Sequence, residues 1–178
     1  MPAQVKIIAP KTEEYKTQIE DFATYSAKFL NDEKKIFAIT VKNNQLACQD
    51  FNRIDLSVSQ FDGCNFATSN FEKGEFNDVV FKNCDFSNCN FQNSYFCRCR
   101  FESCKGIGAN FSDSVFKNVT VKNTNFSYAL FEGARKSAFY AIDSDFQGAI
   151  IANVKLENYG ALNCKFIRTN FCGTTLKG

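Results

Sequence analysis

Large hydrophobic residues recur at every fifth position along most of the chain. Between Leu46 and Leu176, 27 positions have numbers ending in 1 or 6, and phenylalanine fills 17 of them. Leucine, valine or isoleucine fills six more, and no insertion shifts the count. Because a helix repeats about every 3.6 residues and a strand every two, neither element alone explains this period. The pattern predicts a structural repeat of five residues.

A second column, made of small residues, lies two positions before each large residue. It includes Cys64, Ser69, Gly74, Cys84 and Ala109. Residues two apart on an extended segment point to the same side, so the large residue and its small partner are both expected to face inward. The remaining positions are rich in Asn, Asp, Lys, Glu and Ser and are expected to face solvent. Gly or Asn two residues after many large positions predicts a turn in each repeat.

The number of repeats in one coil follows from residues that are twenty apart. Phe139 and Tyr159 place a bulky side chain in the small column where the large column shrinks to Ala141 and Ala161. These exchanges conserve interior volume only if residues twenty apart stack, which predicts four repeats per coil. The predicted core comprises Phe66, Phe71, Phe76, Phe81, Phe86, Phe91, Phe96, Phe101, Phe111, Phe116, Phe126, Phe131, Phe139, Phe146, Tyr159, Phe166 and Phe171.

Several repeats resemble the consensus of the pentapeptide repeat proteins. They are CNFAT (64–68), CDFSN (84–88), CNFQN (89–93) and ANFSD (109–113). The resemblance implies an all-β solenoid, a right-handed quadrilateral parallel β-helix. We expect this β-helix over residues 36–178 with about seven coils, because 27 repeats at four per coil make almost seven. Such a rod is stabilised by the stacking of each coil on its neighbours.

Residues 1–35 have a different pattern, which predicts an N-terminal segment with a helix at about 12–34. Tyr15, Ile19, Phe22 and Phe29 fall near one helical face, and Thr12 is placed to cap the first turn. We expect the helix to cover the open edge of the first coil as an N-terminal α-helix cap. A helix that binds a partner is the alternative.

No matching cap is evident at the other end, where the repeats continue to TNFCGTTLKG (169–178). An uncovered coil offers unpaired backbone groups and apolar side chains such as Phe171 and Leu176. Some pentapeptide repeat proteins dimerise end to end, so the resemblance implies self-association. We therefore expect a homodimer through the C-terminal coil.

The residue types argue against catalysis. The chain has no histidine, which removes His-based general bases and Ser/His or Cys/His pairs. Five of the nine cysteines fall between Cys84 and Cys104, and a thiol- or metal-binding protein is the alternative that they raise. The repeat places Cys64, Cys84 and Cys104 in one inner column and Cys97 outside, so the inner thiols are interpreted as small core residues. We predict no enzymatic activity, no metal and no cofactor.

Lys136 breaks the pattern by placing a charge at a large-residue position. We expect a local bulge to turn this side chain outward. A buried amine, which would require a charged partner, is the alternative.

Apolar residues also appear at outward positions of the later coils. Stacked apolar residues on a surface usually mark an interface. Partial burial of these side chains at the corners of the coil is the alternative. The candidate interface residues are Leu130, Ile150, Ile142, Leu162, Ile167 and Ile107.

Charge is nearly balanced along the chain. The 21 Lys and Arg residues exceed the 19 Asp and Glu residues by two, and within residues 46–178 the net charge is 14 − 13 = +1. Some pentapeptide repeat proteins resemble duplex DNA and bind DNA gyrase, and this mimicry requires an acidic rod. A protein that binds DNA gyrase or another topoisomerase is therefore the alternative function rather than the expected one.

The expected function is a non-catalytic protein-interaction module, a rigid rod whose faces and C-terminal coils bind a protein partner of unknown identity. Balanced charge predicts no direct binding of nucleic acid. The first thirty residues lack the apolar core of a signal peptide, and no apolar run is long enough for a membrane span, so we expect a cytoplasmic protein that does not bind membranes.

Overall fold

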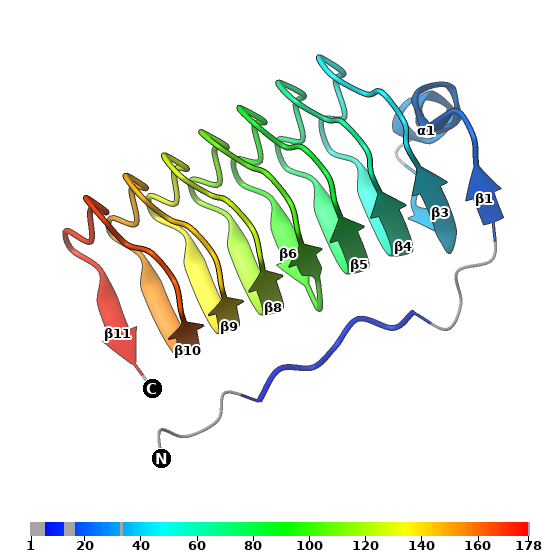
Figure 1. The fold of residues 1–178 in the computed structure, drawn as a ribbon. Helices are drawn as coiled ribbons and strands as arrows, with labels where there is room; N and C mark the ends of the chain where they lie inside the picture. The colour runs from blue at the N-terminus through cyan, green and yellow to red at the C-terminus, as the bar shows by residue number, and fades with distance from the viewer. Residues whose placement is uncertain (1–5, 13–16, 33, 178) are drawn as a thin grey trace.

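Strands that are twenty residues apart pair in parallel and stack into a solenoid with a helix at its N-terminal end (Figure 1). The computed structural model describes residues 6–12, 17–32 and 34–177. The elements are β1 (Thr17–Ile19), α1 (Phe22–Leu30), β2 (Ile36–Phe37), β3 (Ile39–Lys42), β4 (Asp55–Asp62), β5 (Glu75–Lys82), β6 (Tyr95–Cys97), β7 (Arg100–Glu102), β8 (Val115–Lys122), β9 (Arg135–Ile142), β10 (Lys155–Leu162) and β11 (Thr175–Lys177). The predicted parallel β-solenoid is confirmed.

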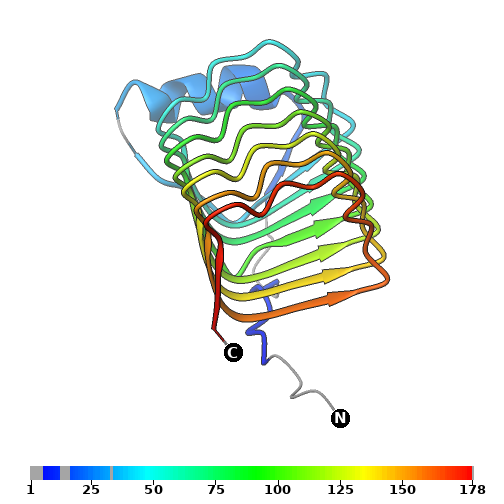
Figure 2. The same cartoon turned by 90° about the vertical axis from the view of Figure 1, so that its left-hand side faces the viewer.

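The pairing register fixes the length of each coil. Phe61 of β4 pairs with Phe81 of β5, and Phe116 of β8 pairs with Lys136 of β9, so each coil contains twenty residues, or four repeats. Bridges on the other sides keep the same offset, as in Asn70 with Asn90. A view close to the solenoid axis shows these coils lying over one another (Figure 2).

A left-handed backbone residue follows each large position by two residues and turns the chain at that point. Asn83, Asn88 and Asn93 have φ values of 50°, 56° and 60°, and Gly63 has a φ of 67°. Asparagine and glycine adopt this conformation at the lowest cost, which explains their frequency there. The turn predicted from the sequence therefore occurs where glycine and asparagine recur.

Phenylalanine rings fill the interior in ladders that run along the solenoid. The Phe91 ring stacks on the Phe71 ring of the preceding coil, with centroids 4.8 Å apart, and on the Phe111 ring of the next coil, at 4.9 Å. Within its own coil it meets the Phe86 ring nearly edge-on, at 66° between planes. Stacked contacts along the axis and edge contacts across it are the two arrangements that aromatic rings prefer.

Most predicted core residues are buried, but three are not. Those from Phe66 to Phe131, together with Phe146, are 2% exposed or less, and Phe139 is 6% exposed. The remaining three, in the last coils, are 37–42% exposed because nothing among the described residues covers them: Tyr159, Phe166 and Phe171. These three residues, predicted as core residues, are therefore only partly buried, and the exposure of Phe171 agrees with the uncovered last coil expected from the sequence.

Side chains of the small column connect successive coils by hydrogen bonds. Ser69 Oγ donates to the carbonyl oxygen of Leu46 at 2.7 Å, and Ser94 Oγ donates to that of Phe71 at 2.8 Å. Cys89 Sγ makes the same contact with the carbonyl oxygen of Phe66 at 2.8 Å. Each acceptor lies 23 residues earlier in the chain, so serine and cysteine have one structural role here.

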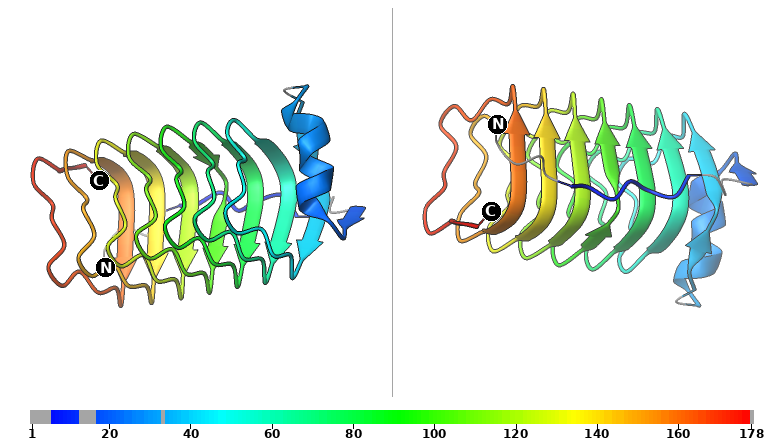
Figure 3. Two further views of the ribbon diagram at one scale, coloured as in Figure 1. Left: turned by 90° about the horizontal axis from the view of Figure 1, so that it is seen from above. Right: turned by 90° about the horizontal axis from the view of Figure 1, so that it is seen from below.

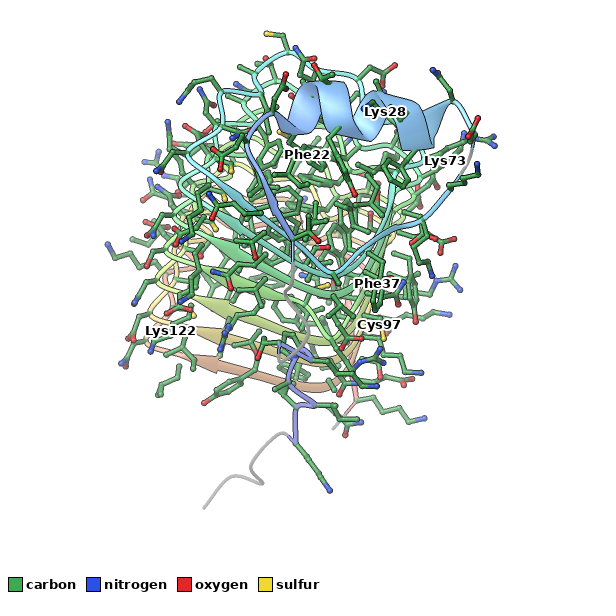
Figure 4. The ribbon with its side chains drawn as sticks, turned by 90° about the vertical axis from the view of Figure 1, so that its right-hand side faces the viewer. Phe22, Lys28, Phe37, Lys73, Cys97 and Lys122 are labelled. Carbon is green, nitrogen blue, oxygen red and sulfur yellow. The ribbon has the colours of Figure 1, made fainter. Side chains whose placement is uncertain are left out.

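Helix α1 covers the N-terminal end of the solenoid. The buried Phe22 side chain lies below α1 in Figure 4. Its ring contacts the Phe61 ring edge-on at 5.0 Å and the Phe51 ring at 5.6 Å. The Phe22 N–H donates to Asn44 Oδ1 at 2.9 Å, which ties the helix to the first coil. These contacts agree with the predicted helix cap. Among the described residues, no helix is both long and apolar enough to cross a membrane.

The helix is shorter than the range 12–34 in which it was expected. It begins after Asp21, whose side chain accepts a hydrogen bond from the Thr24 N–H, rather than near Thr12. Thr17–Ile19 forms strand β1, which pairs with β3 and covers the edge of the first coil with backbone hydrogen-bonding groups. Residues 13–16 lie outside the described residues.

Candidate functional site: the open C-terminal end

Exposed hydrophobic side chains concentrate in the last coils. Of the nine large hydrophobic side chains that are exposed among the described residues, six lie between residues 159 and 176. They are Tyr159, Leu162, Phe166, Ile167, Phe171 and Leu176. This end of the solenoid thus carries most of the exposed large hydrophobic side chains in the described part of the chain, and it lies opposite α1 (Figure 3).

A cavity of about 320 Å³ opens at this end. Ala141 and Ala161 line it at large-residue positions, where an alanine leaves most of the space of a phenylalanine to be filled by another side chain. Phe139, in the small column, fills this space in its own coil and packs edge-on against Phe116 at 5.8 Å. Tyr159 occupies the equivalent position one coil later, where it lines the cavity and stays 37% exposed. The exchange of volumes predicted from the sequence is therefore incomplete in the last coils.

Lys136 lies inside the solenoid and lines this cavity. Its side chain is 3% exposed, and its Nζ lies 3.8 Å from the Phe131 ring centroid and 4.5 Å from the Phe139 ring centroid. The expected bulge is absent, because Lys136 pairs in register with Phe116 on one side and Leu156 on the other. Burial lowers the pKa of the Lys136 ammonium to about 7.

The candidate interface residues are only partly brought together. Leu130 pairs with Ile150, and Ile142 pairs with Leu162, as their spacing predicts. Leu130, Ile150 and Ile142 are half-buried, whereas Leu162 is exposed. Ile107 and Ile167 share a column, but the sixty residues between them place them three twenty-residue coils apart. The Ile142–Leu162 pair reaches the open end through the exposed Leu162, whereas the Leu130–Ile150 pair is followed by Asn170 in the last coil, and Ile107 is remote from the open end.

The contacts of the cysteines indicate a packing role rather than a chemical one. All nine are free, and no group of three or more Cys, Asp or Glu side chains that could hold a metal occurs among the described residues. Burial raises the pKa of the Cys89 and Cys99 thiols to about 12, which disfavours the reactive thiolate. Cys97 was expected on the outer surface, yet it is 6% exposed, with the Arg98 Nη1 atom 3.3 Å from its Sγ.

The N-terminal segment, residues 6–12, crosses the strand-bearing face along the solenoid axis, a feature that the sequence analysis missed (Figure 3). The Ile8 N–H donates to Asn118 Oδ1 at 3.2 Å, and the Lys11 N–H donates to Asp78 Oδ1 at 3.1 Å. The Arg98 guanidinium holds Asp78 through two contacts of 2.7 Å. Burial acts to raise the pKa of Asp78, but Arg98 and the Lys11 N–H outweigh it and keep that pKa below its usual value.

A family model described as "Pentapeptide repeat region" matches residues 54–131. Within these residues the twenty-residue register is unbroken, and the ladder of Phe71, Phe91, Phe111 and Phe131 runs without interruption. Residues 54–131 form a pentapeptide repeat region. The family predicted from the sequence is thereby confirmed. No curated protein sequence matches the chain.

Solved structures that resemble this chain are distant. Full-length QnrB1, a plasmid-mediated fluoroquinolone resistance protein, is 23% identical over 91% of this chain and 90% of that chain, with a TM-score of 0.45. A pentapeptide repeat protein from the thylakoid lumen of Arabidopsis thaliana is 19% identical over 49% of this chain and 61% of its own, with a TM-score of 0.47. Likenesses at this level carry no argument about function.

Proposed function

We propose that this pentapeptide repeat protein is a non-catalytic protein-interaction module that binds through the open C-terminal end of its solenoid. The observation that carries the proposal is the concentration of six exposed large hydrophobic side chains between residues 159 and 176. Contiguous apolar surface of this kind marks interaction sites in soluble proteins. The opposite end is covered by α1 and β1, so the two ends differ in the surface they offer.

A second copy of the chain is the proposed partner at this end. Strand β11 pairs with β10 on one side only among the described residues, so its outer backbone groups are available to another chain. The Phe166 and Phe171 rings, with centroids 5.7 Å apart, provide an apolar centre around which two ends can pack. The pair Ile142–Leu162 extends this surface along one side of the solenoid, where Leu162 is exposed.

The experiment is a measurement of mass in solution by light scattering for the full chain and two lysine variants. Phe171→Lys places a charge in the middle of the open end, where Phe171 is 42% exposed. Phe37→Lys is the matched control, because Phe37 is 53% exposed at the other end of the solenoid (Figure 4). We expect a dimer for the natural chain and for Phe37→Lys, and a monomer for Phe171→Lys. A natural chain that stays monomeric at high micromolar concentration would contradict the homodimer.

A further inference from the structure

Among the described residues, Lys136 is the one charged side chain that lines the cavity at the open end, and none of these residues supplies it with a partner of opposite charge. We propose that the cavity binds an apolar monocarboxylate, whose carboxylate pairs with Lys136 Nζ while its hydrocarbon tail lies along the apolar wall toward the opening. The proposal goes beyond the interaction function and does not rest on it, although Phe166, Phe171 and Leu176 line the cavity and also belong to the proposed interface.

Lys136 Nζ lacks a hydrogen-bond acceptor. The atom carries three N–H donors, but its neighbours are aromatic rings: Phe131 at 3.8 Å, Phe139 at 4.5 Å and Phe116 at 5.6 Å from the ring centroids. The rings stabilise a positive charge, yet within residues 6–12, 17–32 and 34–177 no oxygen forms a hydrogen bond or an ion pair with it. A buried charge without such a partner is unfavourable. A carboxylate supplies both the opposite charge and the acceptor oxygens.

The route from solvent to Lys136 is apolar. Lys136, Leu156 and Leu176 are stacked in register along one wall of the cavity, and Leu176, at 60% exposure, lies at its opening. Two coils separate Leu176 from Lys136, which corresponds to about 10 Å at the usual spacing of neighbouring strands. An occupant that reaches the ammonium must therefore place its hydrophobic part against the leucines. This arrangement fits a molecule with one charged head and one hydrocarbon tail.

The size and lining of the cavity restrict the ligand further. A volume of about 320 Å³ is at the lower end of the range for small-molecule sites, about 300–1,000 Å³. Tyr159 is the only other titratable side chain among the described residues that line the cavity, and no Asp or Glu side chain lines it. One cation therefore faces the cavity without competition from an acidic side chain. These features favour a single carboxylate over a dicarboxylate or a peptide.

Proton uptake on binding provides an independent sign that the ligand carboxylate contacts Lys136 Nζ. Burial lowers the pKa of Lys136 to about 7, so in the empty protein the amine is mostly neutral at pH 8.5. A bound carboxylate favours the charged amine and raises this pKa. Binding at pH 8.5 is therefore expected to take up close to one proton. At pH 5.5, where the amine is already charged, binding is expected to take up almost none.

The test is calorimetric titration of the full chain with decanoate, in two buffers of different ionisation enthalpy at each pH. We expect binding to weaken about thirtyfold or more in Lys136→Met, as is usual when one member of a buried ion pair is removed. Lys155→Met changes an exposed lysine on the next coil and should bind like the natural chain. Ala161→Phe adds a large side chain to the cavity wall while keeping Lys136 and should abolish binding, which keeps the test valid if Lys136→Met fails to fold. The oligomeric state of every variant is measured in the same buffer.

Decanol provides the matched ligand control, because it has the same tail and no charge. We expect decanol to bind far more weakly than decanoate and without proton uptake. Equal binding of the two ligands, or unchanged decanoate binding in Lys136→Met, would overturn the proposal. Absence of decanoate binding by a protein shown to be dimeric would indicate that a second copy fills the cavity, which also overturns it. A monomeric protein that binds decanoate would instead support this site while contradicting the homodimer.

Discussion

The rings of Phe91 and Phe111, twenty residues apart in the sequence, lie with their centroids 4.9 Å apart and their planes within 3° of parallel. Both side chains are fully buried, and each stacks on a further ring beyond the pair. One ring thus contacts three successive coils. Truncation of such a ring removes contacts from the coils above and below as well as from its own.

Phe91→Ala should lower the free energy of unfolding by about 3–5 kcal/mol, the usual cost of emptying a buried phenylalanine site. Phe171→Ala is the matched control, because the same atoms are removed at a position that is already 42% exposed, and its cost should be clearly smaller. Urea denaturation followed by circular dichroism measures both. Equal losses in the two variants would show that burial in the ladder does not determine stability.

Lys136→Met should stabilise the protein near neutral pH. Because the pKa of Lys136 is lowered in the folded state to about 7 from 10.5, the unfolded chain binds more protons between these values, and stability rises with pH across this window. The destabilisation that the buried Lys136 amine causes is fully present below pH 7 and absent above about pH 10.5. At pH 6–7 the variant should gain about 2–4 kcal/mol, since the aromatic rings offset part of the shift.

Denaturation of Lys136→Met and of the natural chain from pH 6 to pH 10 provides the measurement. The difference between the two proteins should narrow as the pH rises. Lys155→Met should show no such trend, because Lys155 is exposed. A constant difference between Lys136→Met and the natural chain would show that the amine titrates alike in both states.

Asn118→Ala should release the N-terminal segment from the strand face. The variant loses the acceptor of the Ile8 N–H, so hydrogen exchange of this amide should accelerate. Asn123→Ala is the matched control, because Asn118 and Asn123 both have a positive φ, of 56° and 50°, and alanine costs about 1 kcal/mol at either position. Only Asn118→Ala should change exchange at Ile8. The same rate in both variants would contradict the anchoring role of Asn118.

The protein should neither inhibit supercoiling by DNA gyrase nor protect gyrase from a fluoroquinolone. Residues 46–178 carry a net charge of +1, whereas a mimic of duplex DNA needs a strongly acidic surface. Gel assays with purified gyrase, in which the protein is titrated to low micromolar concentration, measure both effects. Inhibition or protection at that concentration would show that gyrase recognises this solenoid by something other than charge.

The repeat could be predicted from the sequence because one rule governs it. A large side chain every five residues fixes which positions face inward, and the pairing of Phe61 with Phe81 has the twenty-residue offset inferred from the exchange of phenylalanine and alanine. Applied without exception, the same rule predicts that the Lys136 side chain faces inward, as it does. The expectation of a bulge was wrong because the strand hydrogen bonds hold the backbone of β9 in register and the neighbouring rings of Phe131 and Phe139 accept the cation.

Other features follow no repeating rule and could not be predicted in this way. The N-terminal segment has no hydrophobic period, and its contacts join backbone N–H groups to Asp78 and Asn118, far along the chain. The cavity depends on Tyr159 remaining partly exposed while Phe139 turns into the core, although the two residues occupy equivalent positions. Equivalent positions in the repeat therefore do not reveal whether the coil that contains them is covered by another coil.

The hydrogen bond between Ile8 and Asn118 spans 110 residues, whereas contacts between coils span about twenty. The solenoid can therefore form by successive addition of coils, each closing a short loop of similar entropic cost. The N-terminal segment cannot dock until the coil that contains Asn118 is in place. Its docking is consequently a late event in folding, and the exchange rate of the Ile8 amide reports whether assembly has proceeded from the helix-covered end as far as β8.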